Sequence, residues 1–136
     1  MDRAARRLRR AAGHCDAALR RALRFGDGWY GTGVSAAEIT GVGRRLRELA
    51  DGTGEDAGRL TIAAAAFLTP PGIAAAAPPP GRPLGGSAPS PASVVDDLGR
   101  LAQAGLTICT MWLPIAAEHV DKATEWIADK VMPQLN

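Results

Sequence analysis

Three consecutive residues near the start of the chain, Gly13, His14 and Cys15, have the types and spacing that could bind a phosphate. A glycine turn that leads into a helix leaves backbone amides free at the helix N-terminus, where the helix dipole is positive. Both features suit an anion. The same residues equally fit a plain helix cap, because a motif of this kind is weak on its own.

The other reactive side chains do not form a recognised catalytic pattern. Cys15, Cys109, His14 and His119 lack the spacing of a zinc site. The sequence also holds no nucleophile–base arrangement and no phosphate loop of the nucleotide-hydrolase kind. We therefore expect no metal and name no catalytic residue, and His119 is interpreted as a solvated residue of the last helix.

The helix that would position the glycine turn is expected to begin at Ala17, with Asp16 as its cap. Its apolar residues recur at intervals of three and four, and Gly26 is placed to end it in the left-handed conformation. A short, aromatic, glycine-bounded strand follows. We expect Asp27 to fix the turn into that strand and Trp29 to pack, and neither to take part in catalysis.

Helices and strands alternate through the middle of the chain. Ser35 and Glu38 have the spacing of a capping box and predict a helix that ends near residues 51–52. Residues 60–68 form a continuous apolar run of strand length, which is typical of a strand buried on both faces. A helix is the alternative for its alanines, but the following Pro-Pro pair favours the strand.

The last third of the chain repeats this order. Ser93 is expected to cap a helix, with Asp96 and Asp97 in its first turn, where carboxylates suit the dipole. A strand over residues 106–113 and a final helix over residues 116–132 complete the chain. Strands that alternate with helices predict an α/β fold with a parallel sheet and right-handed crossovers.

Residues 69–91 hold eight of the ten prolines and four glycines, which predicts a long loop without regular structure. A loop of this length in a compact domain is either functional or disordered. We favour a disordered insertion.

The segment from residue 13 to residue 29 resembles a sequence found in the second half of luciferase-like flavin and deazaflavin enzymes. That sequence reads G-G-x-S-x-A-A-L-R-R-A-A-R-x-G-D-G-W, and a helix running into G-D-G-W is uncommon. The resemblance extends over residues 13–136 and implies that they form a luciferase-like domain. The residues that match are Gly13, His14, Ala17, Ala18, Leu19, Arg20, Arg21, Ala22, Arg24, Gly26, Asp27, Gly28 and Trp29.

This resemblance implies the C-terminal part of a (β/α)8 TIM barrel of the bacterial-luciferase-like type, with about three of its eight strand–helix units. It implies an oxidoreductase or monooxygenase lineage, with hydride transfer on the deazaflavin coenzyme F-420, or on FMN as the alternative, and a small-molecule substrate. Gly13, His14 and Cys15 take the position of the turn that helps to hold the cofactor phosphate. Cys15 replaces the usual serine and removes a hydroxyl donor.

The first half of such a barrel is missing from the resemblance, because residues 1–12 do not match it. The family has an apolar strand there, whereas this chain has a basic arm rich in arginine and alanine. The arm is interpreted as a solvated helix, as a patch for nucleic acid, which is the least favoured reading, or as a displaced start that replaces the strand, which is favoured. The whole chain is then a fragment, a non-catalytic remnant, a partner of a chain that supplies the missing half-barrel, or an interaction protein using the basic arm.

The composition sets broad limits. A length of 136 residues suits one domain, and the six aromatic residues and many alanines make a thin core. The two cysteines do not suggest a disulfide framework, so a cytoplasmic location is expected. The alanine-rich run after residue 60 is interrupted by prolines, so no membrane segment is expected.

Overall fold

A parallel sheet of four strands forms the centre of the protein. The structure, a computed structural model, describes residues 10–12 and 15–135. Its strands lie side by side in chain order, so each strand pairs with the next one in the sequence. The α/β fold class with a parallel sheet is thus confirmed. The strands are β1 (Arg10–Ala12), β2 (Gly28–Thr32), β3 (Thr61–Phe67) and β4 (Ile108–Trp112).

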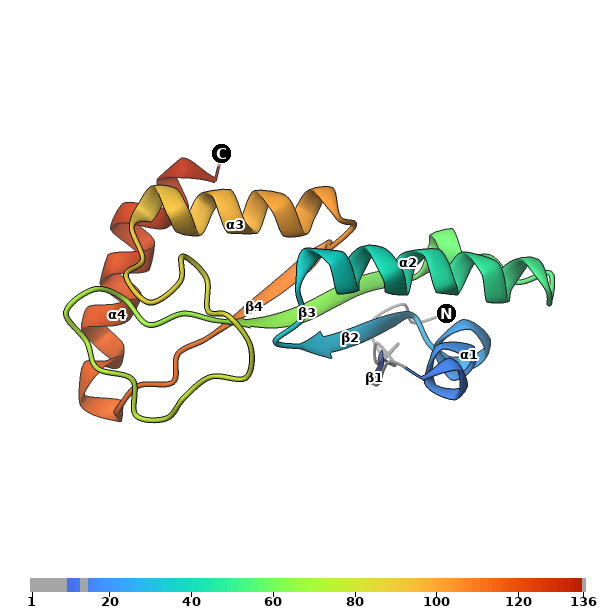
Figure 1. Cartoon of the computed structure of the whole chain (residues 1–136), viewed down its shortest axis with the longest axis horizontal. Helices are drawn as coiled ribbons and strands as arrows, with labels where there is room; N and C mark the ends of the chain where they lie inside the picture. The colour runs from blue at the N-terminus through green and yellow to red at the C-terminus, as the bar shows by residue number, and fades with distance from the viewer. Residues whose placement is uncertain (1–9, 13–14, 136) are drawn as a thin grey trace, which may run out of the picture.

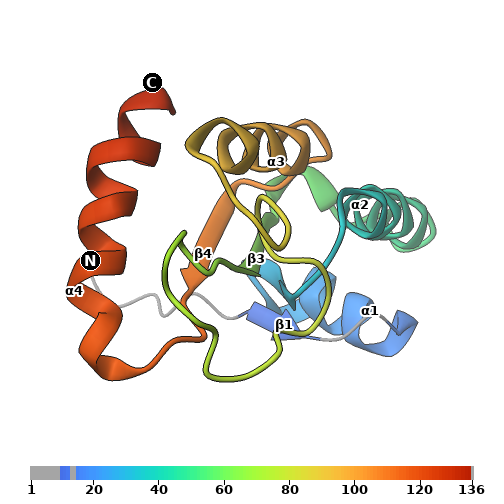
Figure 2. The same cartoon turned by 60° about the vertical axis from the view of Figure 1, so that its left-hand side comes forward.

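Four helices connect or follow these strands, and they lie around one side of the sheet. Figure 2 shows them as an arc, with α1 and α4 at its two ends and α2 and α3 between them. Three of the helices follow β1, β2 and β3 in turn, so each strand–helix–strand unit crosses over on the same side. The helices are α1 (Asp16–Phe25), α2 (Ala36–Asp51), α3 (Pro91–Gln103) and α4 (Val120–Trp126).

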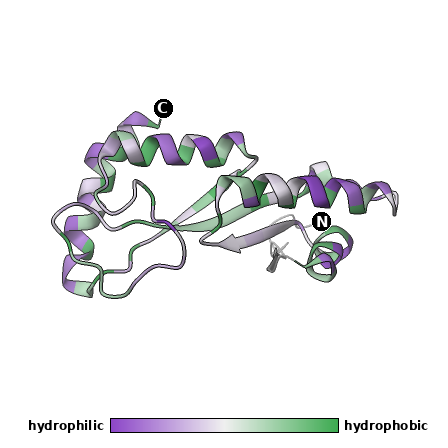
Figure 3. Ribbon diagram, in the orientation of Figure 1, coloured by the Kyte–Doolittle hydropathy of each residue, from purple (hydrophilic) through white to green (hydrophobic). Residues whose placement is uncertain are grey.

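The hydrophobic core lies between the sheet and this arc of helices. The apolar stripe predicted for α2 is buried, with Ile39 and Leu46 each 1% exposed. Trp29 on β2 is fully buried against it, which confirms its packing role. Gly31 leaves room for that ring, because a Cβ there would lie 2.3 Å from the Trp29 side chain. Figure 3 shows β3 and β4 as mostly hydrophobic, whereas α2 alternates hydrophobic and hydrophilic turns.

The strand β1 is the main departure from the expected fold. Residues 10–12, expected to lie in an arm outside the sheet, pair in parallel with Gly28, Trp29 and Tyr30 of β2. The sheet therefore has four strands where three were expected. The pairing explains the difference, because a strand can be held by ladder hydrogen bonds to a neighbour without an apolar pattern of its own. The remainder of the arm, residues 1–9, lies outside the described part of the chain.

Two helix starts differ by one to three residues from the predicted ones. Cys15, not Asp16, is the N-cap of α1, and its side chain makes no capping hydrogen bond. Ser90, not Ser93, caps α3, and Ser93 is its capping-box partner three residues on. The predicted capping box of α2 is confirmed. Gly26 ends α1 as predicted, but with an extended φ of −98°, so the left-handed conformation expected there was wrong.

The final helix is not one regular α-helix over residues 116–132. A 3-10 turn precedes α4, a π-helical turn over Ile127–Val131 follows it, and a 3-10 turn over Met132–Gln134 ends it. Pro133 has no backbone N–H, so α-helical hydrogen bonding cannot continue through it. In the described part of the chain, no helix is long and apolar enough to cross a membrane.

Candidate functional site at the carboxyl edge of the sheet

The carboxyl ends of the four strands meet at one edge of the sheet, because all four strands run in the same direction. Cys15, Gly33, Thr69 and Pro114 lie just beyond β1, β2, β3 and β4 respectively. Figure 1 shows the long loop after β3 gathered at this end, beside α4. Ligands of open α/β sheets and of barrels bind at this edge, so it is the candidate site.

Cys15 is the one predicted phosphate-binding residue that the structure places, since Gly13 and His14 lie outside the described residues. Its carbonyl oxygen accepts hydrogen bonds from the amides of Ala18 and Leu19, at 3.0 and 3.1 Å. The amides of Asp16 and Ala17 precede the first intrahelical donors and point out of the helix end. Free amides of this kind are found at every α-helix N-terminus, so the phosphate-binding role of the turn stays a prediction.

The one carboxylate at this helix end, that of Asp16, is part of an ion pair between α1 and α2. Arg45 donates from Nε to Oδ1 of Asp16 at 2.9 Å and from Nη2 to Oδ2 at 2.5 Å. These hydrogen bonds hold the pKa of the Asp16 carboxyl below its usual value. The carboxylate would otherwise repel an anion at the helix end, and Arg45 offsets its charge.

The long loop after β3 is packed onto the sheet edge, which contradicts the expected disordered insertion. The amide of Leu84 donates to the carbonyl of Phe67 at the end of β3, at 2.7 Å. The amide of Ala76 donates to the carbonyl of Pro114 after β4, also at 2.7 Å. Ile73 and Leu84 are 8% and 5% exposed. The loop thus spans the ends of two neighbouring strands.

The same loop also touches the end of β2 through two glycines. A Cβ on Gly33 would lie 2.5 Å from the carbonyl oxygen of Pro80, and one on Gly81 would lie 2.8 Å from the carbonyl oxygen of Gly33. Both glycines have a positive φ, 63° and 79°. Only glycine allows both this conformation and this approach of two backbones.

An acidic residue of α3 anchors the far end of the loop. Asp97 accepts hydrogen bonds from the Gly85 amide at 2.7 Å and from Nη1 of Arg82 at 2.6 Å. Burial acts to raise its pKa, but the hydrogen bonds from Gly85 and Arg82 outweigh it, and the pKa is lowered. Asp97 lies in the second turn of α3, because the helix begins at Pro91. Neither Asp97 nor Asp96 lies in the first turn, so the predicted role of these two carboxylates beside the helix N-terminus is wrong.

The loop lines an open cleft of about 320 Å³ directly after β3. Its size falls at the lower end of the range for small-molecule sites. Lys122 of α4 lies close by, since its Nζ would be 3.9 Å from a Cβ placed on Gly72. Sequence reasoning missed Lys122 and Asp97, because they meet the loop only through the fold. The lining residues are Thr69, Pro70, Pro71, Gly72, Ile73, Ser87, Ala88 and Pro89.

The remaining candidate side chains have structural surroundings. The Asp27 carbonyl accepts a hydrogen bond from the Thr61 amide at 3.0 Å through the main chain, and the predicted role of the Asp27 side chain in the turn stays a prediction. His119 lies 3.4 Å from Glu118 at the helix surface. Cys109 is half-buried, and burial raises the pKa of its thiol. Among the described residues, no group of three or more His, Cys, Asp or Glu side chains is placed to hold a metal ion.

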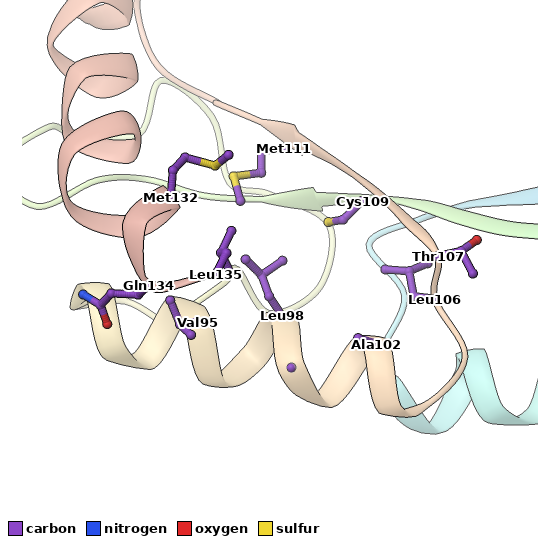
Figure 4. Close-up of a pocket in the computed structure, with 11 residues that line it drawn as sticks. Val95, Leu98, Ala102, Leu106, Thr107, Cys109, Met111, Met132, Gln134 and Leu135 are labelled. Carbon is purple, nitrogen blue, oxygen red and sulfur yellow. The ribbon is translucent and has the colours of Figure 1, made fainter.

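A second, apolar cavity of about 530 Å³ lies on the helix-facing side of β4 (Figure 4). The side chains of Leu98 on α3, Met111 on β4, and Met132 and Leu135 near the chain end point toward one another there. It is lined by the length of β4 and not by the loops at the carboxyl edge. It is therefore separate from the candidate site.

Comparisons with solved structures give the class of fold. An F-420-dependent secondary alcohol dehydrogenase is similar with a TM-score of 0.69 at 11% identity. A riboflavin lyase solved with modified FMN and riboflavin has a TM-score of 0.64 at 14% identity. A coenzyme F-420-dependent tetrahydromethanopterin reductase from Methanopyrus kandleri has a TM-score of 0.63 at 13% identity. All three have the luciferase-like fold, so the resemblance of the sequence is confirmed at the level of the fold.

Each of these matches covers 93% of this chain but only part of the other protein. The covered share is 48%, 42% and 50% of the three structures. The chain therefore spans about half the length of the proteins that it resembles. No protein-family model and no curated protein sequence matches the chain.

Proposed function

We propose that this chain is one half of a luciferase-like oxidoreductase barrel and holds the phosphate of coenzyme F-420, or of FMN, at the carboxyl edge of its sheet. The single observation that carries the proposal is the convergence at this edge. The uncapped N-terminus of α1, the packed loop after β3 and the ends of all four strands meet there. Two of the structures that resemble the chain use F-420, and one was solved with modified FMN.

The described residues fit the phosphate end of such a cofactor. The amides of Asp16 and Ala17 are donors at a helix N-terminus, and Arg45 offsets the negative charge of the Asp16 carboxylate beside them. Gly13 and His14 lie outside the described residues, and their part in the turn stays a prediction from the sequence. When bound, the cofactor supplies the hydride-transfer chemistry, and the protein positions it. This chain contributes half of the loops around the ring, so a substrate site requires a second half-barrel.

A thermal melt of the purified chain tests the proposal, with FMN and with riboflavin as its matched control. Riboflavin has the same ring system without the phosphate. A ligand at about 100 times its dissociation constant stabilises the folded state by about 2.7 kcal/mol. We expect FMN or coenzyme F-420 to raise the melting temperature and riboflavin to raise it less. Equal shifts would overturn the phosphate role of the turn, and no shift with any of the three would overturn the proposed function.

The alternative function is that of a non-catalytic remnant or a partner-dependent interaction protein. The exposed side chains Ile108 and Trp112 on β4 favour dependence on a partner, because they leave apolar surface on one face of the sheet. A role for the basic arm in binding nucleic acid stays a prediction, since residues 1–9 lie outside the described residues. It requires binding that weakens steeply with salt.

A further inference from the structure

On the face of the sheet that points away from the helices, the edge strand β4 exposes apolar side chains. Along β4, Cys109 and Met111 pack on the core beneath α3. The alternate residues Ile108, Thr110 and Trp112 point to the other face, and Ile108 and Trp112 are 40% and 48% exposed. Trp112 packs edge-on against Phe67 of β3, with ring centroids 5.7 Å apart. In a closed barrel this face is the interior, where such side chains are buried.

The sheet has two edge strands that could each pair with a further strand. β1 and β4 are the outer strands, and each pairs on one side only among the strands that the structure describes. Unpaired edges are sites of association. Eight parallel strands close into a barrel, and their inward-pointing side chains fill its interior. Four more strands of the same direction would therefore satisfy both edges and cover the exposed face at once.

We infer that these four strands come from a second copy of this chain. A two-fold axis parallel to the strands keeps all eight strands parallel and sets β4 of each copy beside β1 of the other. Only the shared site depends on the proposed function. The pairing would bring the loops of both copies to one carboxyl edge.

The charges of the outer helices favour a second copy over an unrelated chain. α1 exposes Arg20, Arg21 and Arg24 against the single carboxylate of Asp16. The segment over residues 117–134 carries four carboxylates against two lysines, at Glu118, Asp121, Glu125, Asp129, Lys122 and Lys130. Figure 2 shows α1 and α4 at opposite ends of the arc. The two-fold axis would bring the basic α1 of one copy beside the acidic α4 of the other, twice.

The first experiment is the mass of the purified chain in solution, by sedimentation equilibrium, with circular dichroism to show that it is folded. We expect twice the chain mass of 14.1 kDa, with dissociation favoured by salt. A folded species of 14.1 kDa at the highest soluble concentration would overturn the inference. Capture of a different chain by such a folded monomer would assign the exposed face to that chain instead.

A charge exchange tests the arrangement of the two copies. One variant carries Arg21→Glu and Arg24→Glu on α1, and the other carries Glu125→Lys and Asp129→Lys on the final helix. Each variant alone places like charges at both contacts, so we expect its dimer to weaken at least tenfold. Mixing the two variants pairs opposite charges at both contacts and should restore the dimer. Unchanged dimers of the single variants, or a mixture no tighter than either, would overturn the arrangement.

The mass and the coenzyme melt separate this inference from the proposed function. If the chain is a folded monomer that FMN stabilises, the phosphate-binding turn is supported and the second copy is ruled out. If the chain is a dimer that no coenzyme stabilises, the second copy is supported and the cofactor site is ruled out. Both variants keep the residues of the candidate site, so a loss of dimer in them is not a loss of the site.

Discussion

Arg45 in the middle of α2 holds both carboxylate oxygens of Asp16, the first residue of α1. The two residues are 29 positions apart in the sequence, and each side chain is a little under half exposed. The same guanidinium donates from Nη1 to Glu48 at 2.9 Å, so its three nitrogens are all engaged. A planar fork of this kind fixes direction as well as charge. It sets the orientation of the candidate phosphate-binding helix against its neighbour.

Replacing Arg45 by glutamine should raise the pKa of Asp16 toward its ordinary value of 3.8, because the hydrogen bonds from Arg45 are what lower it. A carboxyl whose folded pKa is lowered adds stability above its unfolded pKa. That stability is lost as the pH falls from about the ordinary value through the lower folded pKa. An NMR titration of the Asp16 carboxyl checks this. Arg44→Gln, on the same helix, is the control and should leave the titration unchanged.

Replacing Asp97 by alanine should release the loop from α3. The change removes an acceptor that binds the Gly85 amide and Arg82, and hydrogen bonds to charged groups contribute about 1.5–3 kcal/mol. We expect the free energy of unfolding in urea to fall by about that amount, and amide exchange in the loop to rise. Asp96→Ala, at the exposed neighbouring position, should have little effect. Equal effects of the two changes would contradict the anchor.

Replacing Gly33 by alanine should destabilise the protein, because its positive φ and the nearby Pro80 carbonyl leave no place for a Cβ. The left-handed conformation alone costs a non-glycine residue roughly 1–2 kcal/mol. Gly41→Ala is the opposite case. Its Cβ would meet nothing within 4 Å, and alanine stabilises a helix interior by about 1 kcal/mol over glycine. Urea unfolding of both variants should give opposite signs.

Replacing Cys15 by serine should stabilise α1 and tighten the binding of a phosphate-bearing cofactor. Cys15 is an N-cap without a side-chain hydrogen bond, and a serine cap contributes about 0.5–2 kcal/mol over alanine. The hydroxyl also supplies a phosphate donor. A thermal melt measures the first effect, and titration with FMN measures the second. Cys15→Ala should show neither gain, and a serine variant that binds FMN no better would leave only the capping role.

Local sequence patterns were sufficient for most of the secondary structure. The apolar stripe of α2, its capping box at Ser35 and Glu38, and the burial of β3 all follow from residues within one element. The alternation of strands and helices then leads to a parallel sheet, because such strands need crossovers. The predicted starts of α1 and α3 differ from the observed caps at Cys15 and Ser90, because several neighbouring residues can serve as a cap.

The candidate site could be foreseen only in part. The sequence alone placed a turn before α1 and identified the loop at residues 69–91 as irregular. Only the tertiary structure decided that residues 10–12 form a strand, that the loop packs onto Gly33 and Pro114, and that Arg45 meets Asp16. The physical reason is the separation in sequence between the groups that interact. Caps and stripes depend on neighbours within a few residues, whereas these contacts join groups that are far apart in the chain and meet only after the sheet has formed.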